Sequence, residues 1–183
     1  MGKWWFLSAA LVLWTALGSM IVRSPAEGTR HGSGSQVPSR IVSMAPNLTE
    51  ILFALGLESK IVAVTQDSDY PPAAAKKPSV GSFWQPNIEA IIAMRPDLVV
   101  TETFEQHREL ARRLRRMGYR SLEVQVETGA GRFEGIGIVG DATGTRERAD
   151  ALCADIQAQI DRLQAVIAGM RPVKVLWVVQ REP

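Results

Sequence analysis

Apolar residues along the chain recur with two periods, and the two periods alternate from one stretch to the next. Runs rich in β-branched residues predict strands, and they occur at residues 41–42, 60–65, 97–101, 121–126 and 173–179. Between them, apolar residues three or four positions apart predict helices, at residues 47–55, 87–94, 105–117, 132–143 and 145–169. Strands and helices in this order favour an α/β fold with a mainly parallel sheet flanked by helices.

Residues that begin and end helices support these boundaries. Asn47, with Glu50 three positions later, is typical of a capping box, and Pro46 prevents the preceding strand from continuing. Asn87 has the side chain that N-cap positions favour. Gly56 supplies a left-handed residue at the end of the first helix. The turn after the first strand is therefore expected to present backbone N–H groups.

Composition divides the chain into segments. An apolar run preceded by Lys3 and followed by small residues predicts a cleaved export signal or a membrane anchor at residues 1–23. Residues 24–38 are rich in glycine, serine and proline, which is typical of a flexible linker. The remaining segments are expected to be an α/β lobe (39–144), a long helix (145–171) and a last strand (172–183). Both interpretations of the first segment imply export from the cytoplasm.

Charge and cysteine content exclude several classes of function. The 183 residues include 21 basic and 19 acidic side chains, and a formal net charge of +2 is too small to indicate a nucleic-acid partner. Arginines crowd residues 108–120, but glutamates accompany them, which favours a solvated helix face over a phosphate site. Cys153 is the only cysteine and lies in a helical pattern, where a buried apolar role is expected rather than a nucleophilic one.

The glycines at residues 135–140 match the GxGxxG pattern of dinucleotide-binding turns, but their context differs from that of such turns. The pattern should directly follow a strand and open a helix, whereas here it lies well beyond the strand that ends at Val126. A helix weakened by glycine is the preferred interpretation. The sequence also offers no nucleophile–base pair, so an enzyme is disfavoured.

The chain resembles, in three stretches, the substrate-binding proteins of cobalamin, haem and iron-siderophore importers. The stretches are RIVSMAPNLTEILFALG from residue 40, SDYPP from residue 68 and GSFWQPNIEAIIAMRPDLVV from residue 81. The cobalamin-binding branch of this family is the most similar. The resemblance implies a receptor rather than an enzyme, in which two α/β lobes joined by one long rigid helix hold a ligand between them and deliver it to an ABC permease.

This resemblance gives each segment an expected role. Residues 39–144 correspond to the N-terminal lobe, residues 145–171 to the helix that connects the lobes, and residues 172–183 to the first strand of a truncated C-terminal lobe. The implied location is periplasmic, and the implied protein partners are the transmembrane subunits of an ABC permease. The implied ligand is cobalamin or another metal chelate, with no cofactor besides it. Contact with the membrane is expected only through an uncleaved N-terminal segment.

The resemblance also implies candidate site residues. Tyr70 and Trp84 correspond to loop aromatics that cobalamin binders place against the flat macrocycle, although from the residues alone both equally suit the lobe's own core. Glu89 corresponds to a glutamate that docks on arginines of the permease, and as a first-turn acid it also complements the helix dipole. Glu102 lies where cobalamin binders can supply a further aromatic, and its charge suits a cationic or metal-bearing ligand. No histidine is expected close to Glu102, so a metal site made by the protein is disfavoured.

Two hypotheses from different classes remain open. The first is an exported ligand-binding component of an ABC importer for cobalamin or a related metal chelate. The second is a membrane-anchored half-receptor that acts through protein contacts without binding a ligand. The long helix bears on both, because it carries an apolar stripe that a second lobe would partly cover. Exposure of that stripe predicts aggregation or dimerisation; its residues are Ile156, Ile160, Leu163 and Ile167.

Overall fold

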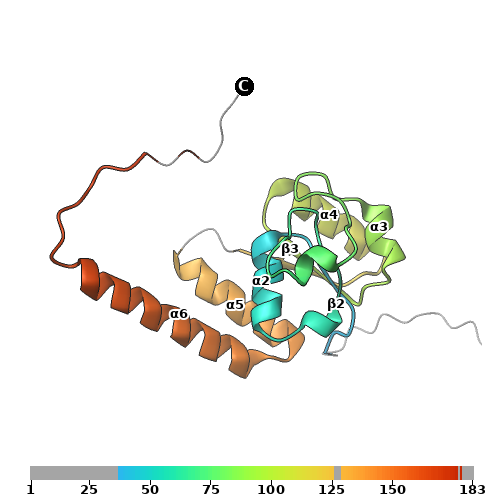
Figure 1. Cartoon of the computed structure of the whole chain (residues 1–183). Coiled ribbons are helices and arrows are strands. Elements are labelled where there is room, and N and C mark those ends of the chain that lie inside the picture. Colours follow the sequence, from blue (N-terminus) through green and yellow to red (C-terminus); the bar gives the residue numbers. More distant parts are fainter. Residues whose placement is uncertain (1–36, 126–128, 177, 179–183) are drawn as a thin grey trace, which may run out of the picture. The chain divides into compact units, whose positions relative to one another are not determined.

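The computed structural model describes residues 37–125, 129–176 and 178, and Figure 1 shows their course. The elements are β1 (Ile41–Ser43), α2 (Pro46–Ala54), β2 (Ile61–Ala63), α3 (Ile88–Ala93), β3 (Leu98–Glu102), α4 (Glu105–Arg116), β4 (Ser121–Val124), α5 (Gly129–Thr143) and α6 (Arg146–Ile167). The segment predicted to be a signal or anchor lies outside the described residues. Among the residues that are described, no helix is long and apolar enough to cross a membrane.

The sheet has four strands in the order β2-β1-β3-β4, and every neighbouring pair is parallel. The predicted parallel sheet is therefore confirmed. Each parallel pair needs a crossover on one face of the sheet, and the helices between the strands supply it. The central strand β1 is completely buried, with Ile41 opposite Leu98 of β3 and Ile61 of β2.

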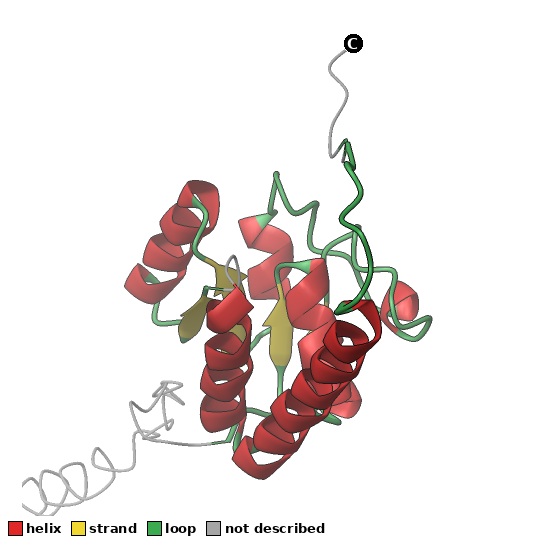
Figure 2. Cartoon of the chain, turned by 90° about the vertical axis from the view of Figure 1, so that its left-hand side faces the viewer, coloured by secondary structure: helices red, strands yellow, loops and turns green. Residues whose placement is uncertain are grey.

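Helices cover both faces of the sheet, as predicted (Figure 2). Successive residues of a strand point to opposite faces, so Ile41 and Val42 belong to two different apolar clusters. The cluster around Ile41 includes side chains of α2, α5 and α6, whereas the cluster around Val42 includes side chains of α3 and α4. Leu48 and Leu52 of α2 are fully buried in the first cluster, and truncating such a leucine to alanine costs about 2–5 kcal/mol.

The start of α2 corrects one prediction. The helix begins at Pro46, and its N-cap is Ala45, whose side chain makes no capping hydrogen bond. Proline suits the first helical position because its φ is already helical and it has no N–H to satisfy, so the helix starts before the expected cap. Asn47 therefore lies inside the first turn, and its Nδ2 donates a hydrogen bond to Oε1 of Glu102 instead. The predicted capping box is wrong.

Two other helix boundaries are confirmed. Gly56 has a φ of 72°, and its N–H donates to the carbonyl of Phe53, which closes the end of α2. Arg148 of α6 donates from Nη1 to the carbonyl of Leu55 at 3.0 Å, so the start of α6 is fixed to the end of α2. At α3, Oδ1 of Asn87 accepts the N–H of Ala90 at 2.9 Å, as expected of an N-cap.

The GxGxxG stretch at residues 135–140 lies within α5, as the preferred interpretation predicted. Gly140 has a packing role there. A Cβ atom at this position would lie 2.6 Å from the Cβ of Ala149, which is fully buried where α6 begins. The glycine thus allows α5 and α6 to approach closely, and no dinucleotide turn is formed.

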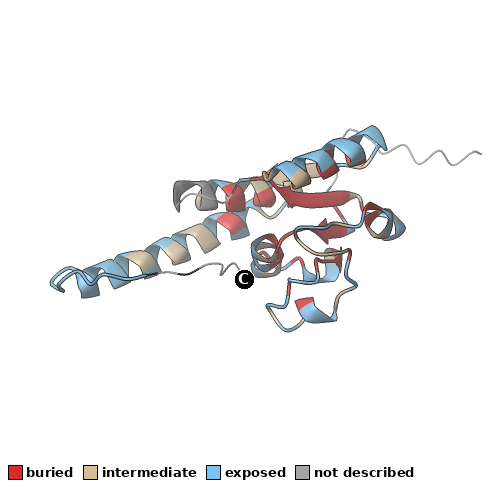
Figure 3. Ribbon diagram, turned by 90° about the horizontal axis from the view of Figure 1, so that it is seen from above, coloured by how far each residue is buried: buried red, intermediate tan, exposed pale blue. Residues whose placement is uncertain are grey.

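The two halves of α6 differ in burial (Figure 3). The first half packs on the lobe through Ala149 and partly buried Leu152 and Ile156. The second half is exposed, with 65% of Leu163 and 67% of Val166 accessible. Of the stripe that the sequence predicted to need a partner, Ile156 packs on the lobe and Ile160 is half-buried, whereas Leu163 and Ile167 are exposed in the described part of the chain.

The strand predicted at residues 173–179 is absent from the residues that the structure describes there, 173–176 and 178. Their side chains are exposed, including 81% of Val173 and 87% of Leu176. A strand needs a neighbouring strand for its backbone hydrogen bonds, and the described sheet offers no partner to this segment.

The surface charges of α4 and the lone thiol agree with their predicted roles. Arg112 makes ion pairs with Glu105 and Glu109, so the positive charge of this helix face is partly neutralised by neighbouring glutamates, and the face is exposed to solvent.

Cys153 is partly buried, and burial, followed by the nearby charge of Asp150, raises the pKa of its thiol. A raised pKa leaves little thiolate at neutral pH and disfavours a nucleophilic role.

Asp97 joins the first and third strands at their amino ends. Its carboxylate accepts hydrogen bonds from the Ser39 N–H (2.8 Å), the Ser39 hydroxyl (2.7 Å) and the Arg40 N–H (2.9 Å). Partial burial by itself raises the pKa of Asp97, but these hydrogen bonds outweigh it and lower the pKa below 3.8. The ionised carboxylate therefore stabilises the fold above that pH, and the contribution is lost as the pH falls through the lowered pKa.

We expect Asp97→Asn to lower the free energy of unfolding at pH 7 by about 1 kcal/mol, because a neutral amide replaces a charged acceptor in a partly exposed site. Urea denaturation at pH 7 and at about pH 3 measures the effect. The difference from the wild type should shrink at the lower pH. Exposed Asp69→Asn is the control, and an equal loss in both variants would contradict the assignment.

Candidate functional site

The candidate site lies where parallel strands end. Because β1, β2 and β3 are parallel, the segments that follow them emerge at one edge of the sheet. After β1 the chain continues to β2, on one side of the pair β1–β3, and after β3 it continues to β4, on the other side. The two connections therefore diverge between β1 and β3. Ligands of open α/β sheets bind at such a point. The hydrogen bond from Asn47, after β1, to Glu102, at the end of β3, spans it.

His107 links this point to the loop that carries Trp84. The imidazole is fully buried, and its Nδ1 accepts the N–H of Glu102 at 3.3 Å. Since Nδ1 accepts, the neutral ring carries its proton on Nε2, which donates to the carbonyl of Phe83 at 2.8 Å. Both ring nitrogens are thus used to position backbone groups.

Aromatic rings gather beside His107. The ring of Phe83 lies edge-to-face against Trp84, with centroids 4.8 Å apart and planes at 89°, and its centroid is 5.5 Å from that of Phe104. Edge-to-face contacts of this kind add about 0.5–1.5 kcal/mol to the burial of the rings. Trp84 contacts both Phe83 and Phe104, and 66% of its surface remains exposed.

The two aromatic loops are joined to each other. Asp67 lies in the loop that carries Tyr70, and its Oδ2 accepts the N–H of Phe83, in the loop that carries Trp84, at 2.8 Å. Under the first loop lies a cluster of buried hydroxyl groups that bond to one another: Ser43, Thr49, Thr65 and Ser68. These contacts fix the loop of Tyr70, whose bond to Pro71 is cis, relative to β1, β2 and α2.

A groove of about 820 Å³ adjoins this edge on the face covered by α2, α5 and α6. Tyr70 and Asn47 stand where the groove meets the sheet edge. Its lining is mostly apolar and consists of Asn47, Glu50, Ile51, Phe53, Ala54, Tyr70, Pro71, Phe133, Ile136, Leu152, Ile156 and Ile160. Such a surface favours a large apolar group over a small charged one.

The predicted site residues differ in accessibility. Tyr70 and Trp84 are 63% and 66% exposed, so neither fills the core of the lobe. Glu102 is only 5% exposed, and ligand contact by this residue stays a prediction. Glu89 is exposed in the first turn of α3, on the face of the sheet opposite the groove. Ligand contact and permease docking would thus use different faces.

The expectation that no histidine lies close to Glu102 is wrong. Only two residues separate β3 from α4, and the first turn of the helix brings His107 back over the end of the strand. The short spacing between the end of β3 and His107 could have indicated, from the sequence alone, that His107 lies close to Glu102. Among the residues that are described, no group of three His, Cys, Asp or Glu side chains is placed to hold a metal ion.

Comparison with known sequences identifies relatives. A family model described as periplasmic binding protein matches residues 41–183. The vitamin B12-binding protein of Vibrio cholerae serotype O1 is 31% identical over 145 residues, which are 79% of this chain and 52% of the relative. The uncharacterized ABC transporter substrate-binding lipoprotein YvrC of Bacillus subtilis is 31% identical over 130 residues, 69% of this chain and 41% of the relative. The chain spans about half the length of the curated relatives it matches.

Solved structures share the fold. The periplasmic vitamin B12 binding protein of Vibrio cholerae matches with a TM-score of 0.64 and 31% identity, over 75% of this chain and 54% of that one. A periplasmic heme binding protein from Pseudomonas aeruginosa matches with a TM-score of 0.67 and 30% identity, over 72% of this chain and 47% of that one.

We expect His107→Phe to lower the free energy of unfolding by about 1–3 kcal/mol, because the aromatic contact with Phe83 persists while both hydrogen bonds of the imidazole are lost. Urea denaturation measures the loss. His107→Gln, which retains a donor for the Phe83 carbonyl, should lose less. Wild-type stability of the Phe variant would show that these hydrogen bonds are dispensable.

Proposed function

Since the chain belongs to the periplasmic binding protein family, we propose that it acts as a substrate-binding component of an ABC importer, outside the cytoplasm, for a corrinoid or a related metal chelate. Relatives named for vitamin B12 and heme binding support this class of ligand. The proposal includes delivery of the ligand to the transmembrane subunits of a permease.

The exposure of two aromatic side chains on one edge of the sheet carries the proposal. A protein normally buries most of a tryptophan, yet 66% of Trp84 and 63% of Tyr70 face solvent. Each is held by a loop that hydrogen bonds fix in place, through Asp67 and Ser68. Little conformational entropy is then lost when a flat ligand covers them, and this favours binding.

The chemistry around the aromatic pair suits a macrocycle with polar substituents. The apolar groove begins beside Tyr70, and it offers the amide of Asn47 and the carboxylate of Glu50 as polar groups at its wall. A corrin ring presents a broad apolar face for the aromatics and amide groups for such partners. Glu102 contributes through Asn47, whose amide its carboxylate orients.

A specific observation also favours the alternative, a half-receptor that acts through protein contacts. The exposed second half of α6 carries an apolar stripe that includes Leu163, Val166 and Ile167, and exposed apolar surface can mark contact sites for other proteins. The two functions differ in a simple test, because only the first requires a corrinoid to bind.

We expect Trp84→Ala to weaken the binding of cyanocobalamin by about 1–3 kcal/mol, as loss of an aromatic anchor does, while the fold is preserved. Isothermal titration calorimetry with the full chain measures the affinity, and circular dichroism checks the fold. Met117→Ala is the matched control, since Met117 is also exposed but follows α4 at the opposite edge of the sheet. Unchanged affinity in Trp84→Ala, or no binding by the wild type, would refute the corrinoid site.

Glu89 is proposed to contact the permease. We expect Glu89→Ala to weaken binding to a corrinoid ABC permease in nanodiscs and to leave cyanocobalamin affinity unchanged, because α3 and the groove lie on opposite faces of the sheet. Added salt should weaken docking, as it does for exposed charges. Glu58→Ala, in the turn before β2, is the control. Equal loss of docking and ligand affinity would contradict separate roles.

A further inference from the structure

Thr49 connects the Tyr70 loop to α2. It is fully buried in the first turn of the helix. Its Oγ1 lies 2.8 Å from Oγ of Ser43 on β1 and 3.1 Å from Oγ of Ser68 in the loop. Within the cluster of buried hydroxyl groups, which lies wholly in the described part of the chain, Thr49 is therefore the member that contacts both β1 and the loop.

Burial alone does not require these contacts. A buried threonine in a helix can satisfy its hydroxyl group through the carbonyl four residues earlier. Thr49 does so with Ala45 at 3.0 Å, and Thr143 of α5 does so with Val139 at 2.7 Å. The hydrogen bond between Thr49 and Ser68 is thus additional, and it joins positions that are 19 residues apart.

Two other hydrogen bonds join the aromatic loops to each other. The N–H of Gln66 donates to the carbonyl of Gly81 at 2.9 Å, and Asp67 accepts the N–H of Phe83 at 2.8 Å. Neither of these bonds reaches α2. Among the hydrogen bonds of the described residues in these loops, the one between Ser68 and its partner in α2 connects the joined loops to that helix.

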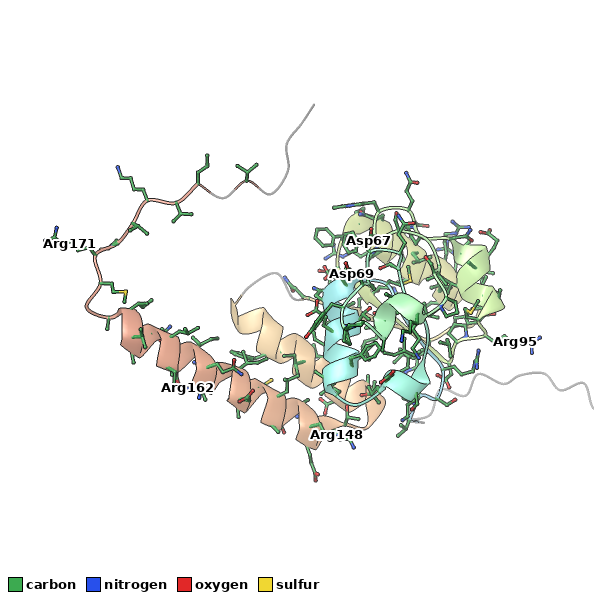
Figure 4. The ribbon with its side chains drawn as sticks, in the orientation of Figure 1. Asp67, Asp69, Arg95, Arg148, Arg162 and Arg171 are labelled. Atoms are coloured by element: carbon green, nitrogen blue, oxygen red, sulfur yellow. The ribbon has the colours of Figure 1, made fainter. Side chains whose placement is uncertain are left out.

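The place of this connection matters because α2 forms part of the wall of the groove, and Tyr70 stands where the groove meets the sheet edge. Figure 4 shows Asp67 and Asp69, the neighbours of Ser68, at the end of α2 where the helix begins. Arg148 lies at the other end, where α2 stops. The contact thus sets the position of the Tyr70 loop relative to the groove wall.

We propose that Thr49 is a positioning residue for the ligand. Through Ser68, its hydroxyl group holds Tyr70 in the place where a macrocycle can contact both the ring and the groove. The proposal deepens the function proposed above and rests on it for the class of ligand. A loop that is already fixed loses little conformational entropy when a ligand binds, so the buried hydrogen bond favours binding without touching the ligand.

Thr49→Val tests this role with little disturbance of the core. Valine has a similar shape and lacks the hydroxyl group. The two hydroxyl groups that lose a neighbour keep other partners, since Oγ of Ser43 lies 3.3 Å from the carbonyl of Ala45 and Oγ of Ser68 lies 2.9 Å from the hydroxyl of Thr65. Neither is left unsatisfied, so we expect the fold to be kept, which thermal unfolding checks.

Hydrogen exchange of the full chain without ligand, followed by mass spectrometry, measures how firmly the loop is held. In Thr49→Val, amides of residues 66–72 should exchange about three to ten times faster than in the wild type. Thr49→Ser keeps the hydroxyl group and should restore slow exchange. Thr143→Val is the matched control, because Thr143 is also a fully buried helical threonine but is bonded within α5. Unchanged exchange in Thr49→Val, or an equal change in the control, would overturn the proposal.

Ligand binding separates a role through Tyr70 from a general effect. Thr49→Val should weaken cyanocobalamin binding about three- to tenfold in isothermal titration calorimetry, and Thr49→Ser should rescue it. In a Tyr70→Ala background, Thr49→Val should cause no further loss, because the side chain that it positions is absent. An equal loss in both backgrounds would contradict the role. If the wild type binds no cyanocobalamin, the corrinoid proposal fails, and the exchange experiment still decides whether Thr49 fixes the loop.

Discussion

The position of β1 between β2 and β3 determines where the candidate site can lie. A strand with parallel neighbours on both sides is buried on both faces, so its ends are the places where its connections reach solvent. At the carboxyl end of β1, the chain turns into α2, while β3 ends beside it in Glu102. Asn47 and Glu102 meet there because of the strand order, although they are far apart in the sequence.

Much of this arrangement could be predicted from the sequence, because it depends on local patterns. Apolar periodicity located the strands and helices, and Asn87 and Gly56 marked boundaries by their own backbone chemistry. The resemblance to import receptors indicated Tyr70 and Trp84, and the structure adds that both are exposed. Their contact with a ligand remains a proposal.

The predictions that were wrong concerned either two residues that compete for the same helix position or contacts between residues from different elements of the fold. Pro46 and Asn47 both suit a helix start, and only the structure shows that Pro46 takes the first helical position. The bridge from His107 to Phe83 depends on how α4 returns over the sheet, which the sequence pattern does not specify. Likewise, a β-branched run such as the one that begins at Val173 predicts a strand only when a neighbour is present to pair with it.

The buried hydroxyl cluster beneath the Tyr70 loop ties this loop to β1 and α2. Thr49 belongs to α2 and Ser43 to β1, yet both are hydrogen-bonded into the network that holds Ser68. A loop transplanted from another receptor would meet these hydroxyl groups as unsatisfied buried donors and acceptors, each at a cost of about 1–3 kcal/mol. The loop of Tyr70 is therefore not interchangeable by itself, and a graft must include the positions on β1 and α2 that the loop rests on.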